Sequence, residues 1–392
     1  MALEEERAEI MRWALANAVE HEGRADVNAV VKKILAERPQ WKCRIKELLP
    51  LVRGVVLEVN TMGANEQEKM LKELGGVPET AKEEKRGLPE LPRAEEFKSI
   101  VTRFAPNPNG PLHLGHVRAA ILSHEYARKY NGKFILRFED TNPENVQPEM
   151  YDLIKQDLRW LGLSWDEEYV QSDRLNVYYD FAERLLSEGK AYVCTCAVEQ
   201  FRSLRDRGGA CACRGLSPAE NMQRWNRMLA GDYKAGEAVL RIKTDLKHPN
   251  PAVREWPAFR IVETPHPRVG SKYRVWPLYN FAVSIDDHEM GVTHIFRGKE
   301  HEVNEERQRF LYAHLGWEYP VAVQYGRLSI PGGELSKTAI VEAVKKGELS
   351  GYNDVRLATL AALRRRGFLP ETLKKVMMDL GACLLYTSPS PR

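Results

Sequence analysis

Hydrophobic residues recur at helical spacing through the first eighty residues of the chain. The apolar positions fall three or four residues apart in successive groups, which predicts amphipathic helices. They include Ile10, Trp13, Ala14, Val19, Val27, Val30, Val31, Ile34, Leu35, Leu48, Leu51, Val52, Val55, Val56 and Val59. A charged stretch containing two prolines follows this region, as is typical of a linker. The pattern therefore predicts a helical N-terminal extension over residues 1–80 and a linker over residues 81–97.

From residue 98 the pattern alternates between strand and helix. An apolar run at 100–105 precedes a helical pattern at 114–130, an Asn131-Gly132 turn and a second strand-like run at 134–138. Strand, loop, helix and strand make one βαβ crossover, so the two strands should be parallel neighbours. A strand at 291–297 and a helix at 303–315 repeat the alternation. The fold class is therefore α/β, with a parallel sheet whose halves lie at residues 98–190 and 275–339.

Residues 191–274 interrupt this alternation and predict an inserted α+β domain. They are rich in Trp, Pro and charge, with short strands such as 238–242. Four cysteines flank an Arg-rich helix at 201–207, in the order Cys-x-Cys, fourteen residues, Cys-x-Cys: Cys194, Cys196, Cys211 and Cys213. Four thiols suit a structural zinc ion, although one intervening residue is fewer than the usual two to four. Free buried thiols are the alternative interpretation.

The end of the chain divides into a helical module and a tail. Residues 340–381 predict helices and carry Arg364-Arg365-Arg366. That basic run is either a solvated face or a contact with an RNA backbone. Residues 382–392 have no amphipathic period, and we expect a non-native tail there.

Composition sets broad limits on the protein class. The chain has 392 residues and a formal net charge of only +3, so bulk charge does not indicate a nucleic-acid partner. No apolar run reaches membrane-spanning length, and the first residues lack the features of a signal peptide. These observations predict a cytoplasmic protein without a membrane partner.

The loop between the first predicted strand and helix carries the main candidate chemistry. It reads PNPNGPLHLGH over residues 106–116 and lies where open α/β sheets bind ligands, beyond the carboxyl end of a strand. His113 and His116 are three residues apart and share one face of the first helical turn. A helix N-terminus offers free N–H groups and partial positive charge, which suit a phosphate.

His113-Leu114-Gly115-His116 resembles the "HIGH" signature of class I aminoacyl-tRNA synthetases. The proline-rich lead and the preceding Thr102-Arg103-Phe104 are similar to the glutamyl/glutaminyl branch. Residues 326–338 resemble the "KMSKS" loop of the same class, but Glu334 replaces the first lysine of the pattern. FILRFEDTNPE (134–144) and DDHEMGVTHIFRGKEH (286–301) resemble archaeal-type glutamyl-tRNA synthetases.

The resemblance implies a Rossmann-type catalytic domain, interrupted by an acceptor-stem-binding domain and followed by a stem-contact module. It implies activation of glutamate by ATP with Mg²⁺ and transfer of glutamate to tRNA-Glu. The implied catalytic residues are His113, His116 and Lys337, and the implied ATP-binding residues are Pro106, Asn107, Gly115, His116, Leu328, Ser336 and Lys337. Relatives continue into anticodon-binding β-barrels, and no part of this sequence resembles them. Whether tRNA-Gln is a second substrate stays open.

Glutamate brings two carboxylates and one ammonium, so its site needs two cationic contacts and one anionic contact. The resemblance implies Arg103, Glu139, Tyr279 and Arg297, with Glu139 for the ammonium and both arginines for carboxylates. A buried Arg297 without a carboxylate partner would be costly, which favours glutamate over glutamine. Two alternatives stay open: a glutaminyl-tRNA synthetase, and a truncated tRNA- or nucleotide-binding fragment with little charging activity.

Overall fold

The computed structural model describes residues 2–21, 23–38, 41, 44–76, 88–326 and 337–382. The chain separates into two compact units, Met1–Gly87 and Leu88–Arg392. Among the described residues, no helix is both long and apolar enough to span a lipid bilayer.

Short 3₁₀ helices are η2 (Ala94–Glu96), η3 (Gln171–Asp173), η4 (Ala212–Gly215), η5 (Pro251–Val253) and η6 (Lys299–His301).

The first unit is built from helices, as the periodicity predicts. Their bounds are α1 (Ala2–Glu20), α2 (Val27–Glu37), α3 (Ile45–Thr61) and α4 (Ala64–Glu73). Ile10, Val30 and Val59 are fully buried in one shared apolar core. Asp26 begins α2 as its N-cap, since its carboxylate accepts the Ala29 N–H at 2.8 Å.

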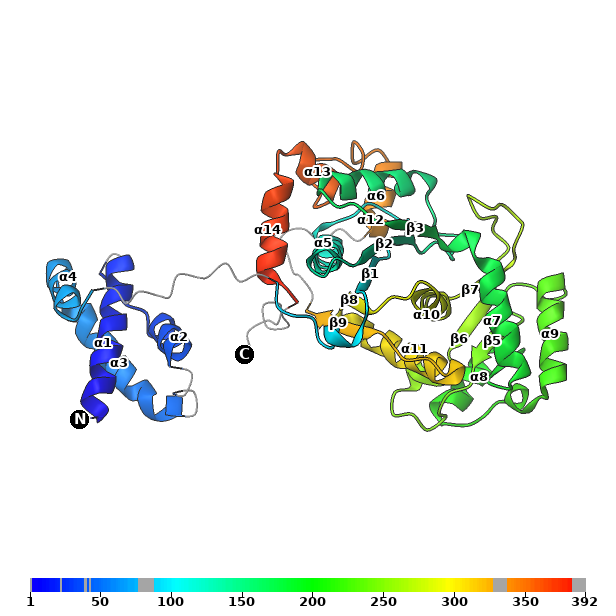
Figure 1. Ribbon diagram of the computed structural model, residues 1–392, viewed down its shortest axis with the longest axis horizontal. Coiled ribbons are helices and arrows are strands. Elements are labelled where there is room, and N and C mark those ends of the chain that lie inside the picture. Colours follow the sequence, from blue (N-terminus) through cyan, green and yellow to red (C-terminus); the bar gives the residue numbers. More distant parts are fainter. Residues whose placement is uncertain are drawn as a thin grey trace. The chain divides into compact units, whose positions relative to one another are not determined.

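The second unit contains a five-stranded parallel sheet in the order β3-β2-β1-β8-β9 (Figure 1). The strands are β1 (Val101–Phe104), β2 (Lys133–Phe138), β3 (Glu167–Val170), β8 (His294–Gly298) and β9 (Val321–Tyr325). β1 and β2 pair in parallel with Val101 opposite Lys133, so the predicted βαβ crossover is confirmed. At the turn into β2, a Cβ on Gly132 would lie 2.0 Å from the Ile100 carbonyl oxygen, which requires glycine there.

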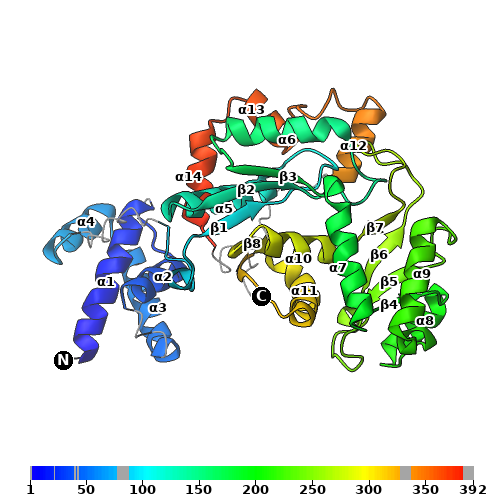
Figure 2. The same cartoon turned by 45° about the vertical axis from the view of Figure 1, so that its right-hand side comes forward.

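Helices cover both faces of this sheet (Figures 1 and 2). On β2, Phe134 and Leu136 pack in a core with α5 (Leu114–Lys129) and α6 (Pro148–Trp160). Ile135 points the other way and packs with Tyr312. That second face belongs to α10 (Tyr279–Glu289) and α11 (Glu302–Leu315). Because both faces are covered, β2 is almost continuously apolar rather than alternating.

A four-stranded antiparallel sheet forms the inserted part, in the order β4-β5-β6-β7. Its strands are β4 (Ala191–Cys194), β5 (Val239–Ile242), β6 (Pro257–Ile261) and β7 (Val275–Pro277), accompanied by α7 (Leu175–Ser187), α8 (Val198–Asp206) and α9 (Pro218–Ala230). We predicted that the run from Val275 resumes the parallel half. Instead β7 pairs with β6, and Trp276 is buried in one core with Trp225. A three-residue apolar run fits either sheet, so its sequence pattern could not assign it.

The last described helices are α12 (Lys337–Lys345), α13 (Leu360–Arg365) and α14 (Pro370–Leu380). We predicted helices over residues 340–381, but residues 346–359 are not helical, and α13 begins only after its N-cap, Thr359, whose hydroxyl accepts the Ala362 N–H. α14 packs on α5, where buried Arg118 donates to the carbonyls of Gly381 at 2.8 Å and Gly326 at 3.0 Å. Most of the predicted tail, residues 383–392, lies outside the described residues.

Candidate active site

The two predicted catalytic histidines lie together at the start of α5. His113 is the N-cap, and its Nδ1 accepts the Gly115 N–H at 3.1 Å. The His113 N–H in turn donates to Nδ1 of His116 at 3.3 Å, and the two ring centroids are 3.9 Å apart. A Cβ on Gly115 would lie 2.9 Å from Cε1 of His113. Glycine is therefore needed for the histidine pair itself, whatever space a nucleotide also requires.

The residues predicted to bind ATP are only partly described. The Pro106 carbonyl accepts the Glu139 N–H at 3.0 Å, which joins the loop after β1 to the end of β2. Oδ1 of Asn107 is buried and has no hydrogen-bond donor in the described part of the chain. Such an acceptor suits an incoming donor group. Leu328 and Ser336 lie outside the described residues, and Lys337 is known only as the first residue of α12.

The four residues predicted to bind glutamate converge at one edge of the parallel sheet. Arg103 lies on β1, Arg297 lies on β8 and Glu139 directly follows β2, so neighbouring strands present them from their carboxyl ends. Tyr279 begins α10. Burial raises the pKa of Tyr279, the charge of Glu139 raises it further, and Arg103 and Arg297 oppose the shift. All four side chains therefore interact electrostatically.

A buried carboxylate, Asp287, holds two of the arginines at this edge. Nε and Nη2 of Arg103 donate to its two oxygens at 3.0 and 3.1 Å, and Nη1 of Arg137 donates at 2.8 Å. Burial alone would raise the pKa of Asp287, but the two guanidinium groups outweigh burial and lower it. Neither Asp287 nor Arg137 was among the site residues predicted from the sequence. Two arginines at adjacent strand ends were a usable signal, because buried arginines need a nearby carboxylate.

The adjacent Asp286 serves as a second buried anchor. Its carboxylate accepts bonds from Arg174 at 2.8 Å, from the Tyr178 hydroxyl at 2.7 Å and from the Gln171 amide at 2.9 Å. Arg174, Tyr178 and Gln171 precede the inserted sheet in the chain, whereas Asp286 follows it. The Asp286 contacts therefore join the segment before the insertion to the segment after it.

Arg297 has a carboxylate partner within the protein, so its burial no longer supports the inference that it needs a glutamate substrate. Its Nη2 donates to Oε2 of Glu305 at 2.7 Å and to the Tyr319 hydroxyl at 2.8 Å. Its Nη1 donates to Gln308 at 3.1 Å. The charge of Arg297 is thus balanced without a substrate, so burial of this guanidinium does not by itself select glutamate. Nε of Arg297 is buried without an acceptor in the described chain and is a donor that a ligand can use.

Glu139 combines burial with cationic neighbours. Its Oε1 accepts a bond from Nη2 of Arg137 at 3.1 Å. Burial raises the pKa of Glu139 to about 6, although Arg137 and Arg103 pull it down. The group is therefore a carboxylate at neutral pH and becomes protonated in mildly acidic solution.

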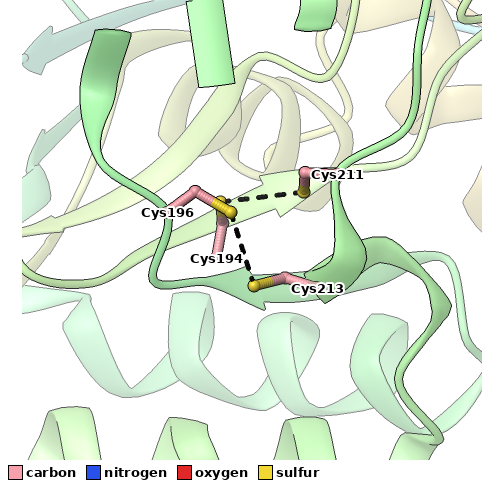
Figure 3. Close-up of side chains that lie close together, drawn as sticks. All are labelled: Cys194, Cys196, Cys211 and Cys213. Atoms are coloured by element: carbon pink, nitrogen blue, oxygen red, sulfur yellow. Dashed lines mark hydrogen bonds between the residues drawn. The ribbon is translucent and has the colours of Figure 1, made fainter. Parts of the chain in front are cut away.

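The four cysteines of the insertion come together at the end of β4 and around η4 (Figure 3). Their sulfur atoms all lie within 4.8 Å of one another, with Cys194 and Cys211 at 3.9 Å and Cys196 and Cys213 at 3.7 Å. Four sulfurs about 2.3 Å from a tetrahedral zinc ion would be roughly 3.8 Å apart. The hydrogen bond between the two thiols lowers the pKa of Cys211 and raises the pKa of Cys194. The cluster geometry therefore fits a zinc ion.

Comparison with known proteins agrees with the fold. A family model described as the catalytic domain of class I tRNA synthetases (E and Q) matches residues 99–384. A curated glutamate–tRNA ligase of Thermococcus kodakarensis is 56% identical over 388 residues, covering 97% of this chain and 67% of the relative. The Pyrococcus furiosus glutamate–tRNA ligase is 55% identical over 381 residues, covering 95% and 66%.

A solved glutamate-tRNA synthetase of Elizabethkingia anophelis has a TM-score of 0.52 and 26% identity, covering 72% of this chain and 61% of that one. The fold and the paired histidines thus define a class I aminoacyl-tRNA synthetase catalytic domain. The chain belongs to the glutamate and glutamine family of that class. It spans about two thirds of the length of the curated relatives it matches.

The Asp287 cluster generates a stability prediction. Asp287→Asn removes the charge that balances Arg103 and Arg137, and breaking a buried ion pair costs about 3–5 kcal/mol. We expect a loss of that size in the free energy of unfolding of the second unit. Urea unfolding followed by tryptophan fluorescence measures it, because six of the eight tryptophans lie beyond residue 88.

Asp232→Asn is the control for this measurement. Asp232 pairs with Arg227 at 3.2 Å on the surface, where both side chains are about half exposed. Surface pairs contribute at most about 1 kcal/mol. Equal losses for the two variants would contradict a special role for the buried cluster.

Proposed function

We propose that this chain activates L-glutamate with ATP and transfers it to the 3′ end of tRNA-Glu. The observation that carries the proposal is the convergence of Arg103, Glu139, Tyr279 and Arg297 at the strand ends beside the paired histidines. The similar curated proteins of Thermococcus kodakarensis and Pyrococcus furiosus are named glutamate–tRNA ligases, which favours glutamate over glutamine. Charging of tRNA-Gln is a finer question that the proposal leaves to experiment.

Each group has a definite task in the proposed reaction. The carboxylate of Glu139 would bind the substrate ammonium, while Arg103 and Nε of Arg297 would bind its carboxylates. The α-carboxylate then attacks the α-phosphate of ATP, and pyrophosphate leaves. His113 and His116 lie at the α5 N-terminus, where partial positive charge stabilises the phosphate oxygens. Lys337 would bind the leaving phosphates, and the Mg²⁺ that accompanies ATP would supply further positive charge to them.

Charging assays test the proposal directly. The chain should attach labelled glutamate, but not glutamine, to tRNA-Glu in the presence of ATP and Mg²⁺. The Thermococcus kodakarensis relative serves as the positive control. Attachment of glutamine would support the glutaminyl alternative, and tRNA binding without charging would support the alternative of a binding fragment.

The first substrate-binding prediction concerns Arg297. Arg297→Ala should raise the KM for glutamate at least tenfold, because removing one partner of a buried charge pair costs about 2–5 kcal/mol. The KM for ATP should change less than about twofold, since the histidine pair is untouched.

Glu305→Gln separates the ion pair that Arg297 makes with Glu305 from its proposed contact with the substrate carboxylate. It keeps the guanidinium but removes its protein partner, so the freed charge should keep or improve glutamate binding. An unchanged glutamate KM in Arg297→Ala would exclude Arg297 from substrate binding.

The second prediction concerns pH. Glutamate keeps its charges between pH 5 and 8, whereas Glu139 has a raised pKa of about 6. Protonation of Glu139 removes the ammonium partner, so the KM for glutamate should rise as pH falls through 6. Glu139→Gln should have a high KM at neutral pH and no such rise. If the wild-type KM were flat between pH 7.5 and 5.5, Glu139 would not be the ammonium ligand.

We further propose that the four cysteines bind one structural zinc ion. The sulfur spacing and the tendency of Cys211 to ionise support it. Nη1 of Arg224 lies 3.3 Å from Sγ of Cys213, and the Tyr192 hydroxyl lies 3.8 Å from Sγ of Cys211. Arg224 would stabilise the negative charge of a thiolate cluster, as outer-shell hydrogen bonds do around metal sites, whereas the Tyr192 hydroxyl accepts a bond from the Cys211 thiol.

The zinc proposal predicts about one equivalent of metal per chain by elemental analysis. Cys211→Ser should lose the metal and lower the melting temperature, because a structural zinc ion contributes folding free energy. Cys43→Ser is the matched control, since Cys43 lies outside the cluster in sequence, and its metal content should be unchanged. A metal-free wild-type protein of the same stability would leave the cluster as four buried thiols.

A further inference from the structure

The loop between β6 and β7 of the inserted sheet folds back on itself and reaches the parallel sheet. His266 and Gly270 exchange two backbone hydrogen bonds within it, at 3.0 and 2.8 Å. Gly270 has a φ of 60°, a conformation that favours glycine. The loop is therefore closed by its own backbone and presents His266 as a fixed group.

His266 is almost completely buried between the two sheets. Its ring stacks on Trp276 with centroids 5.0 Å apart. The Arg268 N–H donates to its Nδ1 at 3.1 Å, so the ring proton must lie on Nε2. Nε2 then donates to the backbone carbonyl of Asp140 at 3.0 Å. Burial lowers the pKa of His266, in agreement with a neutral ring in this tautomer.

The residue that receives this bond directly follows Glu139. The Asp140 side chain is also fixed, because its carboxylate accepts the Ser172 N–H at 2.8 Å and the Tyr151 hydroxyl at 2.6 Å. The Glu139 N–H bonds to the Pro106 carbonyl. The backbone on both sides of the Glu139 Cα is therefore held, and only His266 among these contacts comes from the inserted sheet.

Two further contacts, one from β6 and one from the same loop, join the inserted sheet to the parallel half. Nη2 of Arg260, on β6, donates to Oδ1 of Asn142 at 2.5 Å and to Glu144 at 3.2 Å. Nη2 of Arg268 donates to Asp173 at 2.8 Å. These partly exposed charges orient the loop, whereas the buried His266 makes the contact closest in the chain to the amino-acid site.

We propose that His266 is a positioning residue for amino-acid binding: it fixes the Asp140 backbone and thereby the Glu139 carboxylate. The inserted sheet thus helps to set the affinity for the amino acid, although His266 does not touch the substrate. This inference rests on the proposed function, in which Glu139 binds the glutamate ammonium.

Two amide substitutions separate the two bonds of His266. In His266→Gln the amide nitrogen takes the place of Nε2 and can still donate to Asp140. In His266→Asn the amide takes the place of Nδ1, so the Asp140 carbonyl loses its donor. We expect the KM for glutamate to rise about tenfold in His266→Asn and to stay within about threefold of wild type in His266→Gln. The KM for ATP should change less than about twofold in both.

His314→Asn is a matched control. Nε2 of His314, on α11, bonds to the carbonyl of Lys243, just after β5, at 2.6 Å. It also joins the inserted part to the parallel half through a histidine and a carbonyl, but its partner is distant in sequence from Glu139. The His314→Asn variant should have a lower melting temperature and an unchanged KM for glutamate.

The titration of Glu139 gives a readout that does not require charging activity. The side-chain carboxyl carbon can be followed by NMR in a ¹³C-glutamate-labelled chain, with Glu139→Gln assigning the signal. We expect the pKa of Glu139 to shift in His266→Asn but not in His314→Asn or His266→Gln. An unchanged pKa and KM in a folded His266→Asn would overturn the inference, as would equal effects of His266→Asn and His314→Asn. If wild type neither binds nor charges glutamate, the proposed function fails, and the NMR result still decides whether His266 positions Glu139.

Discussion

The buried ion pairs of Asp287 join helix α10 to the carboxyl ends of β1 and β2. The carboxylate comes from α10, whereas its arginine partners come from β1 and β2, so one side chain joins a helix to two strands. Each guanidinium is almost fully buried and would be costly without that partner. The positions of Arg103 and of Glu139, which also bonds to Arg137, therefore follow from Asp287.

The neighbouring Asp286 explains how an insertion of some eighty residues is tolerated between two halves of one sheet. Its partners Arg174 and Tyr178 lie before the insertion, and Asp286 lies after it. Fixing both ends of an inserted segment lets it vary in its interior without moving the strands that carry the site. His266 adds a contact from within the insertion, so the inserted sheet is fixed at its base and also at one loop.

The parallel core was predictable from the sequence because its signals are local. The apolar runs of β1 and β2, the helical period of α5 and the glycine turn at Gly132 specify one another over about forty residues. The clustering of the four cysteines was also predictable, since short spacings leave few arrangements. The sheet membership of β7 was not, because its three residues are apolar on both sides and only pairing with β6 decides it. The pairing of Arg297 with Glu305 was not predictable either. The start of α11 offers several equivalent carboxylates, and only the tertiary structure selects one of them.

Because Arg297 is paired within the protein, the charge that a bound amino acid would meet depends on two networks of ion pairs and not on Arg297 alone. In the first network, Arg103, Arg137 and Arg174 face Glu139, Asp286 and Asp287, three charges of each sign. In the second, Glu305 divides its two oxygens between Arg297 and Arg309, so two positive charges face one negative charge. Arg309 is about half exposed, so water screens its charge, and Arg297 and Glu305 remain as one balanced pair away from solvent. Under the proposed function, selection of glutamate over glutamine must then rest on donors that the described chain leaves without an acceptor, such as Nε of Arg297, and not on a net charge of the site.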